Sequence, residues 1–132
     1  MQHQSHFQAA QAYRSAAVAV PPLRAVIMMI DGAIKFLQKS VAATEDKQFE
    51  ESHNHMIRAT AILRGLSHNL NFDKGAEVAE GLHTTYHTLI MACLRSFGRP
   101  NSAECYRRII ASLAELRDAW IAVALSPTKP TT

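Results

Sequence analysis

The chain has 132 residues, of which 48% are apolar and 19% charged, and its net charge is +3. This length fits one domain that buries roughly two thirds of its unfolded surface, and the composition excludes an intrinsically disordered chain. The sequence has no basic stripe with interleaved aromatic residues and no apolar run of about 18 residues. We therefore expect neither nucleic-acid binding nor a membrane span.

The two ends of the chain differ from its middle. Residues 1–20 lack the charged-then-apolar pattern of a secretion signal and become more apolar from residue 13 onward. They predict a flexible N-terminal arm that ends in a short docking segment. Residues 126–132 are polar and contain two prolines, which predicts a disordered tail. The two cysteines, Cys93 and Cys105, are not clustered, which together with the missing secretion signal is typical of free thiols in a reducing compartment such as the cytoplasm.

The first long helix is predicted over about residues 21–41. It opens with two prolines, which suit the first turn of a helix because they have no N–H to leave unpaired. On a helical wheel the apolar residues fill an arc of about 200°, against about 100° for an ordinary surface helix. So wide an arc predicts a central helix with neighbours on both sides, or a helix that also lines a groove for a partner. The arc is formed by Ala25, Val26, Ile27, Met29, Ile30, Ala33, Ile34, Phe36, Leu37 and Val41.

The narrow strip opposite this arc is mainly charged. Asp31 and Lys35 are four residues apart with the acid first, which is the favourable order for an ion pair along a helix. Met28 lies within the strip, where the core of a bundle does not reach it. Scattered apolar residues are normal on protein surfaces, but methionines also occur on surfaces that bind apolar helices. Both interpretations of Met28 remain open at this point.

Three further helices are predicted, over about residues 48–70, 76–97 and 102–125. Each has an apolar stripe at spacings of three and four residues. The links between them are short, which predicts antiparallel neighbours. Residues 21–125 are therefore expected to form an all-α, antiparallel up-down four-helix bundle, preceded by a short N-terminal helical segment.

Individual residues indicate which side chains enter the core and where the helices begin and end. The second stripe begins at Phe49, the third contains Tyr86 and the fourth contains Trp120, so these side chains are expected in the core. Asp46 is placed to cap the second helix, and Gly98 is placed to end the third.

Arg117 falls inside the stripe of the fourth helix. It either extends its charged end to solvent at the edge of the stripe or is partly buried and bound to a carboxylate or to helix-end carbonyls. Met91 is expected opposite the stripe of the third helix, and the same two interpretations apply to it as to Met28.

Motifs for catalysis are absent from the sequence. It has no Gly-rich phosphate loop, no nucleophile elbow and no Cys-x-x-Cys, so we expect no enzyme activity and no cofactor. Residues 50–53 and 80–83 both read Glu-x-x-His, the ligand spacing of di-iron bundles. An antiparallel pair of helices would place the two histidines about 14 Å apart, too far for one site. His83 and His87 are four residues apart but lack a third ligand, so we expect no metal site.

Four segments of the chain occur in the order and spacing of a known family. They are Tyr13-Arg14, Pro21 through Leu37 with its Asp31-Gly32-Ala33-Ile34-Lys35-Phe36-Leu37 core, Leu70 through Ala79 with Asn71-Phe72-Asp73-Lys74-Gly75, and Leu113 through Trp120. Leu82, Tyr86 and Leu94 fit the third helix of the same family. Over about residues 13–123 the chain resembles the flagellar secretion chaperone family FliS.

The resemblance implies a cytoplasmic export chaperone that is not an enzyme. Such a protein binds the disordered C-terminal segment of flagellin, prevents its premature polymerisation and helps to deliver it to the flagellar type III export apparatus, where an export-gate component is a further expected partner. The segment around Tyr13 is expected to cover part of the binding groove when no client is bound. We expect a monomer or a weak homodimer.

The candidate site residues follow from the patterns and the resemblance together. Contact with the partner is assigned to Tyr13, Met28, Asp31, Lys35 and Met91. Structural roles are assigned to Gly32, Gly75, Tyr86, Arg117 and Trp120. Two other functions stay open from the sequence, a metal-binding helical bundle and a generic helical adaptor.

Overall fold

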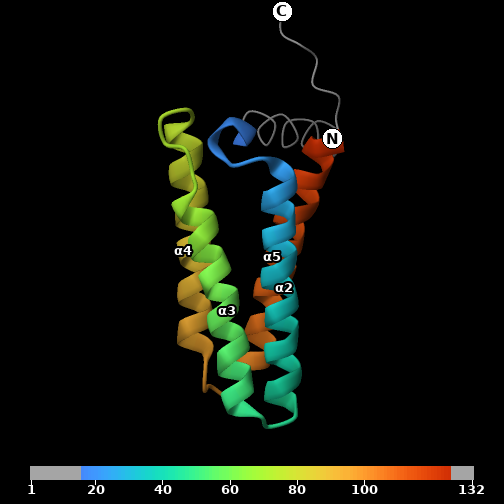
Figure 1. The fold of residues 1–132 in the computed structure, drawn as a ribbon. Helices are drawn as coiled ribbons and strands as arrows, with labels where there is room; N and C mark the ends of the chain where they lie inside the picture. Colours follow the sequence, from blue (N-terminus) through green and yellow to red (C-terminus); the bar gives the residue numbers. More distant parts are fainter. Residues whose placement is uncertain (1–15, 126–132) are drawn as a thin grey trace, which may run out of the picture.

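The computed structural model describes residues 16–125. A short 3-10 helix, η1 (Ala17–Ala19), precedes four long helices. They run up and down in turn, each antiparallel to the next along the chain (Figure 1). The described residues contain no strand, so the prediction of an all-α four-helix bundle with a short N-terminal helical segment is confirmed. The long helices are α2 (Leu23–Glu45), α3 (Phe49–His68), α4 (Ala76–Ser96) and α5 (Ser102–Leu125).

Helix α2 packs extensively against both α3 and α5, whereas α4 packs less extensively against the same two helices (Figure 1). The wide apolar arc of α2 is the reason, because it supplies one apolar flank for each neighbour and buries its middle in the core. Val26, Ile30, Ala33 and Leu37 are almost fully buried, as the helical wheel predicted. Ala25 lies at the margin of the arc and is exposed, so the arc is narrower there than predicted.

The centre of the bundle holds three large side chains with polar atoms, Tyr86 of α4 and Tyr106 and Trp120 of α5. Each is at most 1% exposed, which confirms the core positions predicted for Tyr86 and Trp120. Each aromatic side chain buries a large apolar area, so these residues contribute much of the stability that holds α4 and α5 together. Phe49 is different, because it is 57% exposed at the first turn of α3 and the prediction that it joins the core stripe is wrong.

Small polar residues join α2 to α3. The Ser40 hydroxyl donates to the backbone carbonyl of Ser52 at 2.8 Å and lies 2.9 Å from the Ser52 hydroxyl. Thr44 Oγ1 lies 2.6 Å from Ser52 Oγ. Buried hydroxyl groups cost free energy unless they are hydrogen-bonded, and here the two helices satisfy each other. The side chains are short, so the helices also approach closely.

The turns at the lower end of the bundle follow the backbone rules only in part. Gly98 has φ of +79°, the left-handed conformation that glycine adopts at helix C-termini, as predicted. Asp46 is the C-cap of α2, while the N-cap of α3 is Gln48 without a side-chain cap. The prediction that Asp46 caps α3 is wrong, because Lys47 has a φ of 59° and this left-handed turn places both Lys47 and Gln48 between Asp46 and the helix start at Phe49.

At the upper end, η1 lies against the loop between α3 and α4. The Ala19 carbonyl accepts a hydrogen bond from the Asn71 N–H at 2.7 Å, and Ala16 and Ala19 are buried. A Cβ added to Gly75 would lie 3.1 Å from the Ala19 Cβ, closer than side chains normally pack. Gly75 therefore permits the close approach of η1 to the bundle. Tyr13 precedes η1 and lies outside the described residues.

Candidate partner-binding site

The outer strip of α2 carries the exposed apolar residue that the sequence singled out. Met28 is 67% exposed and lies one helical turn after the exposed cation Arg24 and about two turns before the exposed cation Lys35. Its predicted position outside the core is confirmed. A large apolar side chain so exposed on an ordered helix gains free energy from any partner that covers it.

Asp31, on the same helix, has a different partner from the one predicted. Its Oδ1 accepts a hydrogen bond from Arg117 Nη1 of α5 at 2.9 Å, and no ion pair joins it to Lys35 in the described part of the chain. Asp31 lies on the side of α2 that faces α5, whereas Lys35 points to solvent. The long-range pair forms because Arg117 is already held beside α2 by the packing of α5.

Arg117 thus binds a carboxylate, which was one of the two interpretations left open. Its side chain is 27% exposed, and its Nε also donates to Asp118 at 3.2 Å. The hydrogen bond to Asp31 raises the pKa of Arg117 above its already high ordinary value. The residue therefore stays charged and links α5 to α2 at the middle of the bundle.

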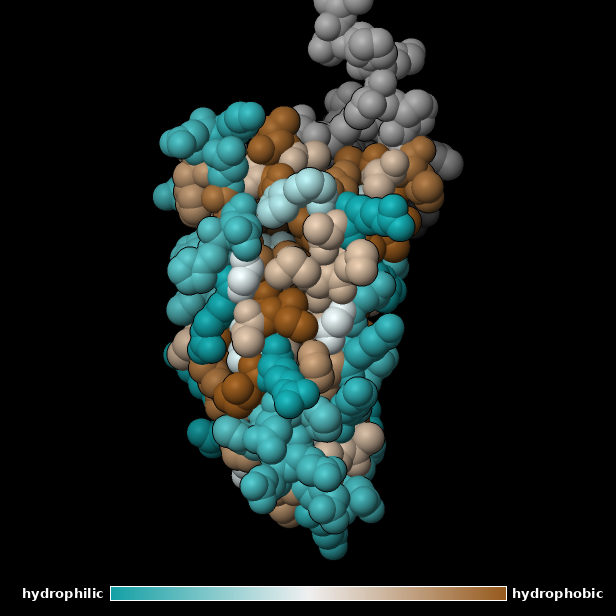
Figure 2. Space-filling model, viewed as in Figure 1, coloured by the Kyte–Doolittle hydropathy of each residue, from teal (hydrophilic) through white to brown (hydrophobic). Residues whose placement is uncertain are grey.

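The seam between α2 and α3 is closely packed and apolar. A Cβ added to Gly32 would lie 3.4 Å from Ile62 Cδ1, and one added to Gly65 would lie 3.4 Å from Met29 Cε. These small residues allow the two helices to approach each other, which places neighbouring apolar side chains side by side at the surface. Figure 2 shows the resulting apolar area over the upper half of the seam. We call it the α2–α3 patch; it comprises Ala25, Met28, Met29, Ala61 and Ile62.

Cations border the lower part of this seam. Lys39 Nζ lies 5.7 Å and Arg58 Cζ 5.8 Å from the centre of the Phe36 ring, which is half-buried below the patch. The ring attracts both charges through its quadrupole. An apolar surface with cations along its border is suited to an amphipathic helix whose polar flank is acidic.

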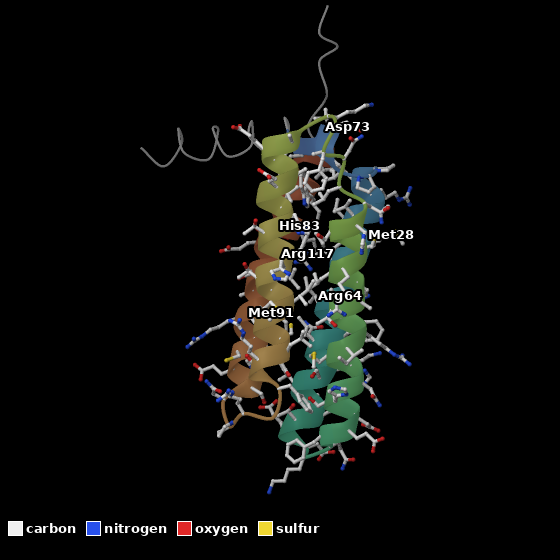
Figure 3. The ribbon with its side chains drawn as sticks, turned by 90° about the vertical axis from the view of Figure 1, so that its left-hand side faces the viewer. Met28, Arg64, Asp73, His83, Met91 and Arg117 are labelled. Carbon is white, nitrogen blue, oxygen red and sulfur yellow. The ribbon has the colours of Figure 1, made fainter. Side chains whose placement is uncertain are left out.

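A groove of about 330 Å³ lies between α3 and α4. Figure 3 shows Arg64 on α3 and His83 and Met91 on α4 on the two sides of it. Met91 lines this groove and is half-buried, neither in the core nor fully exposed. We call this cavity the α3–α4 groove; it is lined by Arg64, Ser67, His68, Phe72, His83, His87, Ile90 and Met91.

Two histidines in this groove are held by their neighbours. His83 Nδ1 lies 2.6 Å from Ser67 Oγ, its ring contacts the edge of Phe72, and it stacks on His87 at 6.4 Å between ring centres. His53 packs against Phe97 at the other end of α3. The two Glu-x-x-His motifs therefore lie at opposite ends of the α3–α4 pair, and residues 16–125 contain no group of three potential metal ligands.

The buried thiol and phenol of the core lie near each other. Burial raises the pKa of Cys93 to about 12. Burial and the nearby Cys93 and Cys105 thiols raise the pKa of Tyr106 to about 12 as well. Both cysteines are free, as predicted. Cys93 is accordingly a packing residue that stays protonated at neutral pH, not a reactive thiol.

Sequence reasoning did not identify Arg64, His68 and Phe72 or the α3 side of the α2–α3 patch. The spacing of four residues between Arg64 and His68, and again between His83, His87 and Met91, was a usable signal on each helix. It did not show that these two rows face each other across one groove.

None of the helices among residues 16–125 is long and apolar enough to cross a membrane.

The fold and its surface define a class of protein, a four-helix bundle with an exposed apolar patch and cations at its border. Comparison of the sequence with models of known protein families identifies the family within this class. The model of the FliS family, described as flagellar protein FliS, matches residues 5–127, and the chain belongs to this family. FliS proteins are flagellar export chaperones. No curated protein matches the chain.

Proposed function

We propose that this chain is a cytoplasmic chaperone that binds the disordered C-terminal segment of flagellin. It prevents premature polymerisation of the subunit and assists its delivery to the flagellar type III export apparatus, where the loaded chaperone contacts an export-gate component. Membership of the FliS family supports the export role. The activity is binding alone, without a catalytic step, a metal or another cofactor.

The exposure of Met28 is the observation that carries the proposal. Met28 is 67% exposed within the α2–α3 patch, and it forgoes about 1.5–3 kcal/mol that full burial of such a side chain supplies. A client helix laid along the seam would cover Met28 together with Met29 and Ile62. The exposed Ala25 and Ala61 are small, so the client backbone can come close to both helices.

Charges at the border of the patch set the orientation of the client. Arg24 is exposed one turn before Met28 and Lys35 about two turns after it, and both would pair with acidic residues on the polar flank of the client helix. Asp31 acts differently, because its carboxylate is engaged by Arg117. We assign it the role of holding α2 against α5, so that the patch stays rigid.

A rigid patch suits a disordered client. The client segment loses conformational entropy when it folds on the chaperone, and this cost lowers the affinity. A preformed surface adds little ordering cost of its own. While the segment is bound as helices it cannot pack against other subunits, which is how binding prevents polymerisation.

The N-terminal segment has a regulatory part in this proposal. We propose that the region around Tyr13, outside the described residues, covers part of the binding surface when no client is present. The docking of η1 supports this, since the Asn71–Ala19 hydrogen bond attaches the start of the described chain to the upper end of the bundle. A bound client would displace the segment before it.

Titration calorimetry with a peptide of the flagellin C-terminal segment tests the proposal. We expect saturable one-to-one binding and an increase in helical circular dichroism beyond the sum of the two components. Absence of binding by calorimetry and in a pull-down from flagellated cells would refute it.

A further inference from the structure

The α3–α4 groove is a surface that the apolar patch does not explain. Arg64 and Ser67 lie on the side of α3 that faces α4, whereas Ile62 and Gly65 lie on the side that faces α2. The groove and the patch are thus separated by the width of one helix, and a single wrapping segment can reach both. Along α4 the groove extends from His83 to Met91, about 12 Å, which is the length of about two helical turns.

The charge of the groove is one-sided. Its lining contains the guanidinium of Arg64 and three imidazoles, those of His68, His83 and His87, and no carboxylate. Arg64 takes part in none of the ion pairs between described residues, whereas Arg107, Arg108 and Arg117 each bind a carboxylate. One unpaired guanidinium beside imidazole nitrogens that can donate hydrogen bonds, with no anion among the lining residues, favours a ligand that supplies a negative charge.

The other part of the groove lining is apolar. Phe72 is 44% exposed, Met91 is half-buried and Ile90 forms part of the floor. His83 is held in place by Ser67, and when the Ser67 hydroxyl donates to Nδ1 the ring carries its proton on Nε2, which makes that nitrogen a hydrogen-bond donor. A ligand that fits both parts carries a carboxylate beside apolar side chains.

The chain itself supplies no such ligand from outside the described residues. Residues 1–15 and 126–132 contain no aspartate or glutamate. Neither of these two stretches supplies an acidic side chain, and a client segment bound at the α2–α3 patch is the source that we infer.

We propose that the α3–α4 groove is a second contact site for the flagellin segment, which binds an aspartate or glutamate of the client together with the apolar residues next to it. This inference rests on the proposed function. Arg64 and His87 bind the carboxylate, and Phe72 and Met91 pack against the apolar residues. The groove thereby fixes the register of the client on the chaperone.

A double-mutant cycle between chaperone and client tests this contact. Arg64→Leu removes the charge and keeps an apolar stem, and each acidic residue of the client peptide is replaced in turn by its amide. We expect Arg64→Leu to weaken binding about tenfold, as the loss of a charge-assisted hydrogen bond does. For one position of the client, the amide peptide should bind the wild-type chaperone about tenfold more weakly than the acidic peptide does. The Arg64→Leu variant should bind the amide peptide and the acidic peptide with equal affinity.

The matched control is Arg95→Leu, which removes the same charge from an exposed position on α4 outside the groove. It should leave the affinity within about twofold. Equal losses for both variants, or equal affinity of Arg64→Leu and wild type, would overturn the second contact while leaving the proposed function intact. Failure of the wild-type chaperone to bind the acidic peptide would instead overturn the proposed function and this inference with it. Both variants should melt at the wild-type temperature, because both arginines are exposed.

Discussion

Arg117 offers the sharpest test of how the bundle holds its surface in place. Its 2.9 Å hydrogen bond to Asp31 joins α5 to α2, with side chains 27% and 43% exposed. Fully exposed ion pairs contribute about 0–1 kcal/mol, and hydrogen bonds to charged groups about 1.5–3 kcal/mol. For this half-shielded pair we expect a coupling of about 1 kcal/mol. Arg117→Met, which keeps the apolar stem, should therefore lower the unfolding free energy by about 1–2 kcal/mol, equivalent to a fall in Tm of about 3–6 °C.

Chemical denaturation of Arg117→Met, Asp31→Ala and the double variant measures the coupling. The pair between Arg108 and Glu104 is the matched control, because both side chains are more than half exposed at 76% and 65%. Arg108→Met should cost less than about 0.5 kcal/mol. If the Arg117–Asp31 coupling is no larger than that of the control pair, the pair does not hold α2 against α5 and the structural role given to Arg117 is wrong.

Three further predictions concern the core, the upper end and the N-terminal segment. Unfolding exposes Cys93, whose pKa then falls from about 12 toward its ordinary 9.0, so this thiol should lower the stability above pH 9 by up to about 1.4 kcal/mol per pH unit, and Tyr106 should add to the decline above pH 10. Denaturation between pH 8 and 11 measures the decline, which should be less steep for a Cys93→Ala variant. Gly75→Ala should destabilise the fold by about 1 kcal/mol because the new Cβ meets Ala19, whereas Gly81→Ala should stabilise it by about 0.5–1 kcal/mol because nothing lies within 4 Å of the new Cβ. Thermal melts measure both changes, and the same sign for both variants would refute the packing argument. Removal of residues 1–15, which keeps η1, should speed association with the flagellin peptide in stopped-flow measurements, because a competing intramolecular contact is lost, and an unchanged rate would contradict the autoinhibitory role of Tyr13.

Much of the fold was predictable because it depends on local patterns. Two prolines before α2 and Gly98 after α4 mark helix ends through backbone restrictions that act within a few residues. The helical wheel placed Ala33 inside and Met28 outside, since the side of a helix that faces the core follows from its own sequence.

The errors share a different cause. Asp31 was paired with Lys35 because both lie on one helix, but its partner is Arg117, 86 residues away in the sequence. A single helix does not show which neighbour lies beside each flank, and the α3–α4 groove was missed for the same reason. Both depend on how the four helices are rotated against one another, which packing of the whole bundle decides.

Met28→Lys gives the most direct test of the central claim, that the α2–α3 patch binds flagellin. The residue is outside the core, so the variant should keep its helical signal and Tm, while its affinity for the flagellin peptide in titration calorimetry should fall about 5- to 150-fold, or about 1–3 kcal/mol. Ala33→Lys, at a fully buried position of the same helix, should instead unfold the bundle. A Met28→Lys protein that binds as tightly as wild type would place the binding surface elsewhere, and one that melts far lower would show that Met28 belongs to the core.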